Sequence, residues 1–325
     1  MKKYIIKRLL IIIPTILVIA IAIFTLMYFT PTDPARMVLG DSATTEQLEA
    51  YREYLGINKP YIQQLGDYLY RLFIKFDLGK SWILQTNVSD EIANRLPRTF
   101  IISMYSMLIG AICGIPLGVV AATKQGSWVD KLVLFISSIM HCIPGYVIAL
   151  LLLIVFAVNL HWVSIVPTGT FKDYILPCVC ILIGSFSGLS RSMRTSMLEV
   201  IRSDYVMAAR AQGFSRRSVN YAHALPNAMI PIVTQLGAQF ASALGGTIIL
   251  ETIFSIPGMG LYIQTAIGSS DIPIITSVVV FLSIWFCLVM LLVDVVYALL
   301  DPRIKAQYEA QGERKHKHRR KAVKA

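Results

Sequence analysis

Charged residues are scarce in this chain. They make up 15% of its 325 residues, whereas hydrophobic residues make up 55%, and the mean hydropathy is +0.63. A chain with this composition has more apolar surface than the core of one soluble domain usually holds, which argues against a soluble globular protein. The composition predicts an all-α, polytopic membrane protein.

Several motifs of covalent chemistry are missing. The five cysteines all fall in apolar stretches, so no disulfide framework is indicated. The segment Gly79-Lys80-Ser81 resembles the end of a phosphate-binding loop, but Ile74 stands where that loop needs its first glycine. The sequence shows no His/Glu metal set, nucleophile motif or close carboxylate pair. This argues against the interpretation as a membrane-bound enzyme. We expect no resident metal or cofactor.

Long apolar stretches are what the chain does have. About 20 helical residues cross a hydrocarbon core of about 30 Å. The first stretch is too long for the core of a signal peptide and lacks a small-x-small cleavage site, so it is expected to stay as an anchor. Six spans are predicted, at Leu9 to Phe29, Thr99 to Ala122, Leu132 to Val158, Tyr174 to Met193, Ile230 to Phe254 and Ile274 to Leu300.

The positions of lysine and arginine predict the orientation. With a cytoplasmic N-terminus, 21 of the 30 basic residues lie on inner segments. Both termini are then cytoplasmic, and the net charge of +11 follows from topology without a nucleic-acid partner. The predicted parts are a cytoplasmic N-terminus 1–8, a first helix 9–29, an extracytoplasmic helical segment 30–97, a core 98–300 of five helices with a cytoplasmic loop 194–229, and a basic tail 301–325 that meets membrane lipid.

The outer segment 30–97 contains two helical patterns. In TTEQLEAYREYLG, Thr44 and Gln47 can form a capping box and Gly56 can end the helix. From Pro60 to Phe76, apolar residues recur on one face. These helices are expected either to pack over the bundle or to meet a soluble partner.

Polar residues inside the spans are candidates for a translocation path. One polar stripe on the fifth span is formed by Gln235, Gln239 and Ser242. Hydrogen bonding between helices inside the bundle is the competing interpretation of this stripe. His141 in the third span can face a polar path, or it can bond to a neighbouring helix. In the last span, Asp294 is expected to pair with a basic inner residue or to reach interfacial water.

A polar and basic segment, 203–231, separates two apolar stretches. Residues 204 to 212 favour a helix, with Asp204 placed to cap its start. Gly213 can take the left-handed conformation that ends a helix, and a second helix is predicted to begin near Ser215. A short helix of this kind suits the groove of a partner protein, although an ordinary loop helix is the simpler interpretation.

The pattern of this segment resembles the EAA loop of permease subunits of binding-protein-dependent ABC importers. Ala208-Ala209 is followed by Gly213 and then by Leu225-Pro226, at the family's spacing. Met207 replaces the usual glutamate and His223 the usual isoleucine. The resemblance is closer to the oligopeptide, dipeptide and nickel branch, and it extends along the chain in RLLIIIPT, YREYLGINKP, FDLGKSW, RLPRTF, ARAQGFSRR, ETIFSIPGMG and DPRIK.

The resemblance implies a type I ABC importer permease fold and a set of partners in the cytoplasmic membrane of a prokaryote. These are a second, homologous permease subunit, two cytoplasmic ATPase subunits that bind the ATP, and an extracytoplasmic substrate-binding protein. The chain itself would have no catalytic residue. Carried onto this sequence, the ATPase-coupling contact is formed by Asp204, Met207, Ala208, Ala209, Arg210, Ala211 and Gly213.

An ion-driven carrier or a passive channel is the main alternative. Ion-driven carriers usually need ionisable groups near the middle of the bilayer, whereas the carboxylates of the predicted spans, Glu251 and Asp294, lie near span ends. Driving force from outside the chain is therefore favoured. The substrate stays open at this point: His141 favours a nickel or other metal complex, and the breadth of the family favours peptides.

Overall fold

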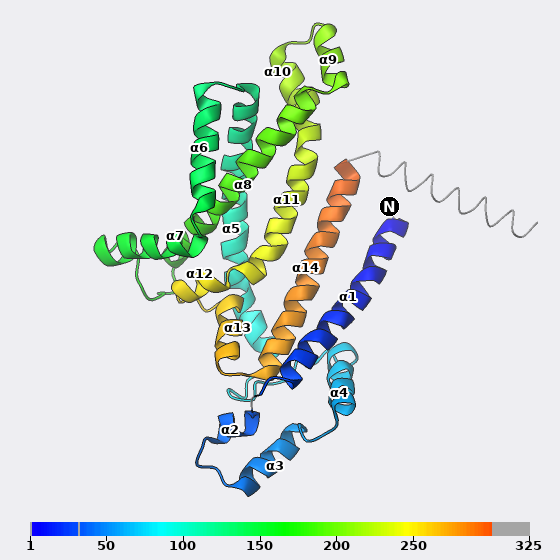
Figure 1. Cartoon of the computed structure of the whole chain (residues 1–325), viewed down its shortest axis with the longest axis vertical. Helices are drawn as coiled ribbons and strands as arrows, with labels where there is room; N and C mark the ends of the chain where they lie inside the picture. Colours follow the sequence, from blue (N-terminus) through cyan, green and yellow to red (C-terminus); the bar gives the residue numbers. More distant parts are fainter. Residues whose placement is uncertain (1, 32, 301–325) are drawn as a thin grey trace, which may run out of the picture.

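Long helices form the body of the molecule (Figure 1). A computed structural model of the chain describes residues 2–31 and 33–300, and within these ranges there is no β-strand. Four helices in the described chain are long and apolar enough to cross a membrane, and a bent helix pair makes a fifth. The body consists of α1 (Lys2–Tyr28), α5 (Val88–Thr123), α6 (Trp128–Cys142), α8 (Ile175–Ile201), α11 (Leu225–Gly246) and α14 (Ile272–Leu300).

Shorter helices lie at the two ends and in the middle of this body. The ends are called here the α9 end and the α3 end, and both the start of α1 and the end of α14 lie in the half toward α9 (Figure 1). The predicted tail 301–325 lies outside the described residues. The shorter elements are α2 (Pro34–Leu39), α3 (Thr45–Leu55), α4 (Tyr61–Phe73), α7 (Gly145–Leu152), η1 (Leu153–Asn159), η2 (Phe171–Tyr174), α9 (Asp204–Ala211), α10 (Arg216–Ser218), η3 (Val219–Ala224), α12 (Ile248–Ile253) and α13 (Met259–Gly268).

Two predicted spans are broken rather than continuous. The third divides into α6 and the α7–η1 segment, which are bent by 89°. Proline explains this break, because Pro144 has no N–H and keeps the preceding Ile143 out of the helical region, at φ −87° and ψ 120°. The fifth span divides into α11 and α12 at Thr247. Periodicity alone did not separate these pieces.

Glycine residues allow α5 to pack closely on α8. A Cβ added to Gly110, Gly114 or Gly118 would meet α8 atoms at 2.8, 3.1 and 2.6 Å, respectively. Residues four apart on a helix share a face, so the three glycines form one groove along α5. The two helices therefore form the closely packed centre of the body.

Helix α1 lies against α14 at the edge of the body. Arg8 pairs with Asp294 at 3.1 Å, so the expected basic partner of this carboxylate is confirmed. Toward the α3 end, Tyr68 and Leu72 of α4 are buried against apolar residues of α1 and α14. The helix predicted from Pro60 thus packs on the bundle by its apolar face.

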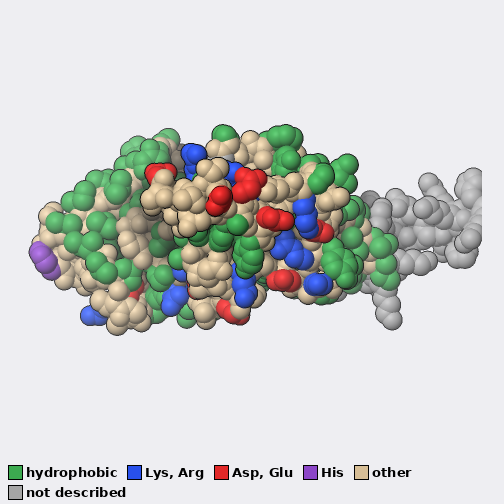
Figure 2. Space-filling view, turned by 90° about the horizontal axis from the view of Figure 1, so that it is seen from below, with side chains coloured by type: hydrophobic (Ala, Val, Ile, Leu, Met, Phe, Trp, Pro, Cys, Tyr) green, Lys and Arg blue, Asp and Glu red, His purple; other side chains and the backbone are tan. Residues whose placement is uncertain are grey.

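The 30–97 segment covers the α3 end. The capping box predicted at the start of α3 is present, with Gln47 N donating to Thr44 Oγ1 at 3.3 Å, and Gly56 ends the helix at φ +70°. Figure 2 shows acidic and basic side chains mixed on this face. Arg52 pairs with Asp33 and holds the pKa of that carboxyl below its usual value.

A turn of the same segment is fixed to the start of α14. The side chain of Ser81 donates to Asp271, which is buried, and Trp82 N donates to the other carboxylate oxygen at 3.2 Å. Ser277 adds a hydrogen bond to the carbonyl of Leu78 at 2.6 Å. The FDLGKSW motif therefore has a structural role, which is to hold the 30–97 segment on α14.

Candidate functional site

Helix α9 sits on the end of the bundle through one apolar face. Val206 is fully buried and Ala209 is 8% exposed. Both belong to one apolar cluster that also includes Val119 and Ala122 of α5, Leu189, Met193 and Met197 of α8, Val219 and Ala224 of η3, and Ala228 and Ile232 of α11. Burial of these side chains fixes α9 relative to three long helices.

The opposite face of α9 is open. Asp204, Met207, Ala208, Arg210 and Ala211 are all exposed, and the Met207 side chain is 50% exposed. Of the predicted coupling residues, Ala209 alone points into the bundle. The structure thus divides the predicted set into an outward face and one residue that seats the helix.

The start of α9 differs from the prediction. Ser203, and not Asp204, is the residue at the N-cap, with extended φ and ψ of −72° and 152°. The Ser203 hydroxyl donates to Val200 O at 2.6 Å instead of accepting from α9. Asp204 occupies the first turn, where its negative charge is favourable next to the unpaired N–H groups of the helix.

The end of α9 is as predicted. Gly213 has φ +85°, the left-handed conformation that glycine adopts at little cost. Ser215 then caps the next helix, because its side chain accepts from Ser218 N at 3.2 Å. The chain therefore turns sharply between two helix ends.

Side chains hold this turn against α11. Asn227 donates to Tyr205 Oη at 2.8 Å and to His223 O at 3.2 Å. The rings of Phe214 and His223 lie 5.2 Å apart. His223, which departs from the family pattern, therefore packs beneath the turn, and residues 203–227 form one braced unit that is called here the elbow.

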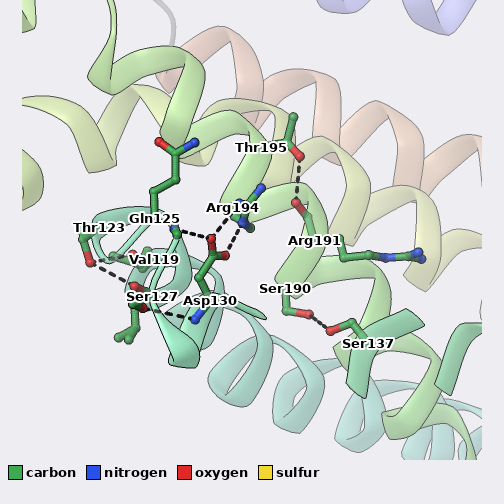
Figure 3. A network of polar contacts seen from close by, with 12 residues as sticks. Val119, Thr123, Gln125, Ser127, Asp130, Ser137, Ser190, Arg191, Arg194 and Thr195 are labelled. Atoms are coloured by element: carbon green, nitrogen blue, oxygen red, sulfur yellow. Dashed lines mark hydrogen bonds and ion pairs between the residues drawn. The ribbon is translucent and has the colours of Figure 1, made fainter. Parts of the chain in front are cut away.

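A polar network joins α6 to α8 next to the elbow (Figure 3). Arg194 donates two hydrogen bonds to the carboxylate of Asp130, one of them at 2.8 Å, and Gly126 N donates to the same carboxylate at 2.9 Å. The Asp130 side chain is only 3% exposed. The sequence prediction missed this pair, although an acid at the start of one span and an arginine at the inner end of the next were visible signals.

The predicted path residues do not form one group. Gln235 and Gln239 face α8 at Gly188, where their amide nitrogens lie 3.5 and 3.6 Å from the position that a Cβ would take. Gln239 Oε1 is buried without a hydrogen-bond partner among the described residues, and Ser242 is exposed. His141 is exposed at the end of α6, beside the bend.

Glu251 is fully buried where α12 meets α13. Its carboxylate accepts from Thr99 at 2.6 Å, from Thr247 at 2.9 Å, and from the backbone N–H groups of Gly260 and Leu261 at 2.7 and 3.1 Å. Its carboxylate holds the first turn of α13 at a fixed position, toward the α3 end.

Comparisons with known proteins agree with this architecture. Residues 114–306 match the family model "Binding-protein-dependent transport system inner membrane component", and residues 1–103 match the N-terminal model of such membrane components. A putative peptide transport system permease protein of Brucella abortus (strain 2308) is 36% identical over 313 residues, covering 94% of this chain and 99% of the relative.

Two further proteins extend the comparison. The glutathione transport system permease protein GsiC of Escherichia coli (strain K12) is 35% identical over 305 residues, covering 94% of this chain and 99% of that protein. An inward-facing structure of the MetNI methionine ABC transporter shares the fold, with a TM-score of 0.52 at 18% identity, over 65% of this chain and 96% of that one. The chain belongs to the family of binding-protein-dependent transport system inner membrane components.

Proposed function

We propose that this chain is the membrane permease half of an ATP-driven importer of peptides, in which the outward face of α9 receives the movement of an ATPase subunit. The observation that carries the proposal is the two-sided character of α9. Its inner face is buried in a cluster shared with α5, α8 and α11, while Met207, Ala208 and Ala211 stay open. A displacement of α9 by a partner bound to its open face is passed to the bundle through its buried face.

Peptides are the substrate class that the relatives support. Two of them are named for peptide and glutathione transport, and both align with nearly the whole chain. An uncharged path suits peptides because it offers hydrogen bonds without a fixed charge that would retain a zwitterion. Gln235, Gln239 and Ser242 would supply such groups, with His141 as a further candidate. Neither relative is named for nickel transport, and among the described residues His141 belongs to no group of three or more side chains that could hold a metal ion.

The proposed assembly places α9 in the cytoplasm of a prokaryotic cell. The partners would be a second permease, two ATPase subunits and an extracytoplasmic binding protein, with both termini on the ATPase side. The ATP site would lie on the partners. Both the start of α1 and the end of α14 lie in the half of the molecule toward α9 (Figure 1). This supports the proposed topology, since an even number of crossings returns the chain to the side where it began.

Copurification and transport test this proposal together. The chain is expressed with the permease and ATPase subunits of its transport system, and the purified assembly is placed in liposomes with the binding protein. We expect ATP-dependent uptake of a labelled di- or tripeptide. Uptake that continues without ATP hydrolysis, or a chain that purifies without any ATPase subunit, would support the carrier or channel alternative instead.

A pair of matched variants locates the contact. Ala208→Trp places a large side chain on the open face of α9, so we expect the ATPase subunits to be lost during purification. Ala93→Trp makes the same change at an exposed site on α5, and here the ATPase subunits should stay bound. Equal recovery of ATPase subunits with both variants would contradict the assignment of α9.

A further inference from the structure

The apolar cluster that seats α9 does not extend to α6. Its described members come from α5, α8, α9, η3 and α11, and none comes from α6. Helix α6 instead lies along α8 and α5, with large apolar side chains such as Phe135 and Ile139 left exposed. A displacement of α9 is therefore passed directly to α8 and α11, but only indirectly to α6.

Polar contacts make the link between α6 and α8. At the α9 end, the Arg194 guanidinium donates two hydrogen bonds to Asp130, and the paired side chains are 18% and 3% exposed, respectively. Farther along the same interface, the hydroxyls of Ser137 and Ser190 lie 2.8 Å apart and are both buried. A two-point arginine–carboxylate contact is stiff in direction as well as strong, because its planar groups must stay aligned.

Helix α6 leads from this contact to the middle of the molecule. It ends at Cys142, and the chain continues into α7 after the 89° bend. Helix α7 packs on α8 and on α12, where Ala149 shares an apolar cluster with Leu250 and Phe254. The α6–α7 arm thus connects the elbow end of the bundle to the turn between α12 and α13.

We infer that Asp130 and Arg194 are positioning residues which make α6 move together with α8 when α9 is displaced, so that the movement reaches the α6–α7 arm. This inference rests on the proposed function. Asp130 contacts neither a substrate nor an ATPase subunit in this scheme. Its effect comes through Arg194, which lies nine residues before Ser203, the first residue of the elbow.

The test uses the assembled importer in liposomes, with Asp130→Asn and Arg194→Lys compared at equal amounts of assembled complex. Both variants lose the two-point contact, and Arg194→Lys keeps the positive charge. We expect peptide uptake per ATP hydrolysed to fall by about 5- to 150-fold, the range typical of lost coupling between two sites. Arg191→Gln is the matched control, because Arg191 lies on the same helix and, within the described part of the chain, donates only to Ser187 O. Its uptake should equal that of the wild type.

A distance measurement separates this role from a purely structural one. Spin labels are placed at Phe135 on α6 and Thr195 on α8, both exposed, after replacement of the five cysteines. In the wild type, we expect the distance between the labels to stay constant when ATP is added, because the helices move as one body. In Asp130→Asn it should change with ATP.

Two results would overturn the inference: a wild-type label distance that changes with ATP, or normal coupled uptake in Arg194→Lys. If Asp130→Asn fails to assemble while Arg194→Lys transports normally, Asp130 serves folding alone and the inference is wrong. The proposed function fails differently, because wild-type protein would then show no ATP-driven uptake at all.

Discussion

Gly213 offers the sharpest test of how the elbow is built. Its φ of +85° lies in the region that L-residues rarely adopt, and an added Cβ would have no atom within 4 Å. A substitution there therefore meets no steric obstacle from neighbours, and its cost is that of the backbone conformation alone. For a residue with a side chain, that cost is about 1–2 kcal/mol, and it is greatest for a β-branched residue.

The chain can relieve this strain by changing the turn. Gly213→Val is expected to shift the turn toward negative φ, which tilts α9 away from its seat and moves Met207 and Ala208 from their present direction. The global fold should persist, because 1–2 kcal/mol is small beside the total of about 5–15 kcal/mol for a domain. Membrane insertion should stay normal while ATP-driven uptake falls.

Asparagine provides the control at the same position. It tolerates the left-handed conformation better than other residues with a side chain, so Gly213→Asn should keep most of the uptake. The assay compares uptake by Gly213→Val, Gly213→Asn and wild type in liposomes, at equal amounts of inserted permease. Equal uptake by the valine variant and the wild type would refute the idea that this backbone conformation aims α9.

Three further predictions concern packing and charge. Gly118→Ala should lower the unfolding free energy by about 1–3 kcal/mol, because its Cβ would lie 2.6 Å from α8 atoms, whereas Gly184→Ala has open space; thermal melting of the purified protein checks both. Glu251→Ala leaves buried N–H groups without an acceptor, at about 1–3 kcal/mol each, and should lower the melting temperature markedly. The pKa of Asp33 is lowered by Arg52, so this pair stabilises the fold fully above the usual carboxyl pKa of about 3.9. The stabilisation is lost as the pH falls through the lowered pKa that Asp33 has in the folded protein. Over that pH range, the melting temperature of Arg52→Gln should fall by less than that of the wild type. An equal fall in both proteins would contradict the pairing.

Local rules were enough to predict many elements of this chain. The α3 capping box, the left-handed Gly213 and the start of a helix near Ser215 each depend on residues a few positions apart, so their geometry is encoded within one or two turns. The apolar lengths likewise predicted where the long helices lie. These features follow from backbone conformation and periodicity, which a sequence displays directly.

Contacts between distant residues were beyond the same rules. The pairing of Asp130 with Arg194 joins positions 64 residues apart, and the Glu251 carboxylate joins α5 to the α12–α13 turn. The sequence pattern also could not show that Gln235 and Gln239 lie against Gly188 of α8, or that His141 lies at the bend after α6.

The amino-acid sequence by itself determined the membrane class, the positions of the apolar helices and the turn chemistry of the elbow, because composition and short-range spacing control each of these. Only the tertiary structure decided which face of α9 is buried, which carboxylates are paired, and where two of the predicted spans break into separate helices. Those properties depend on which helices lie side by side, and packing of surfaces far apart in the chain selects that arrangement.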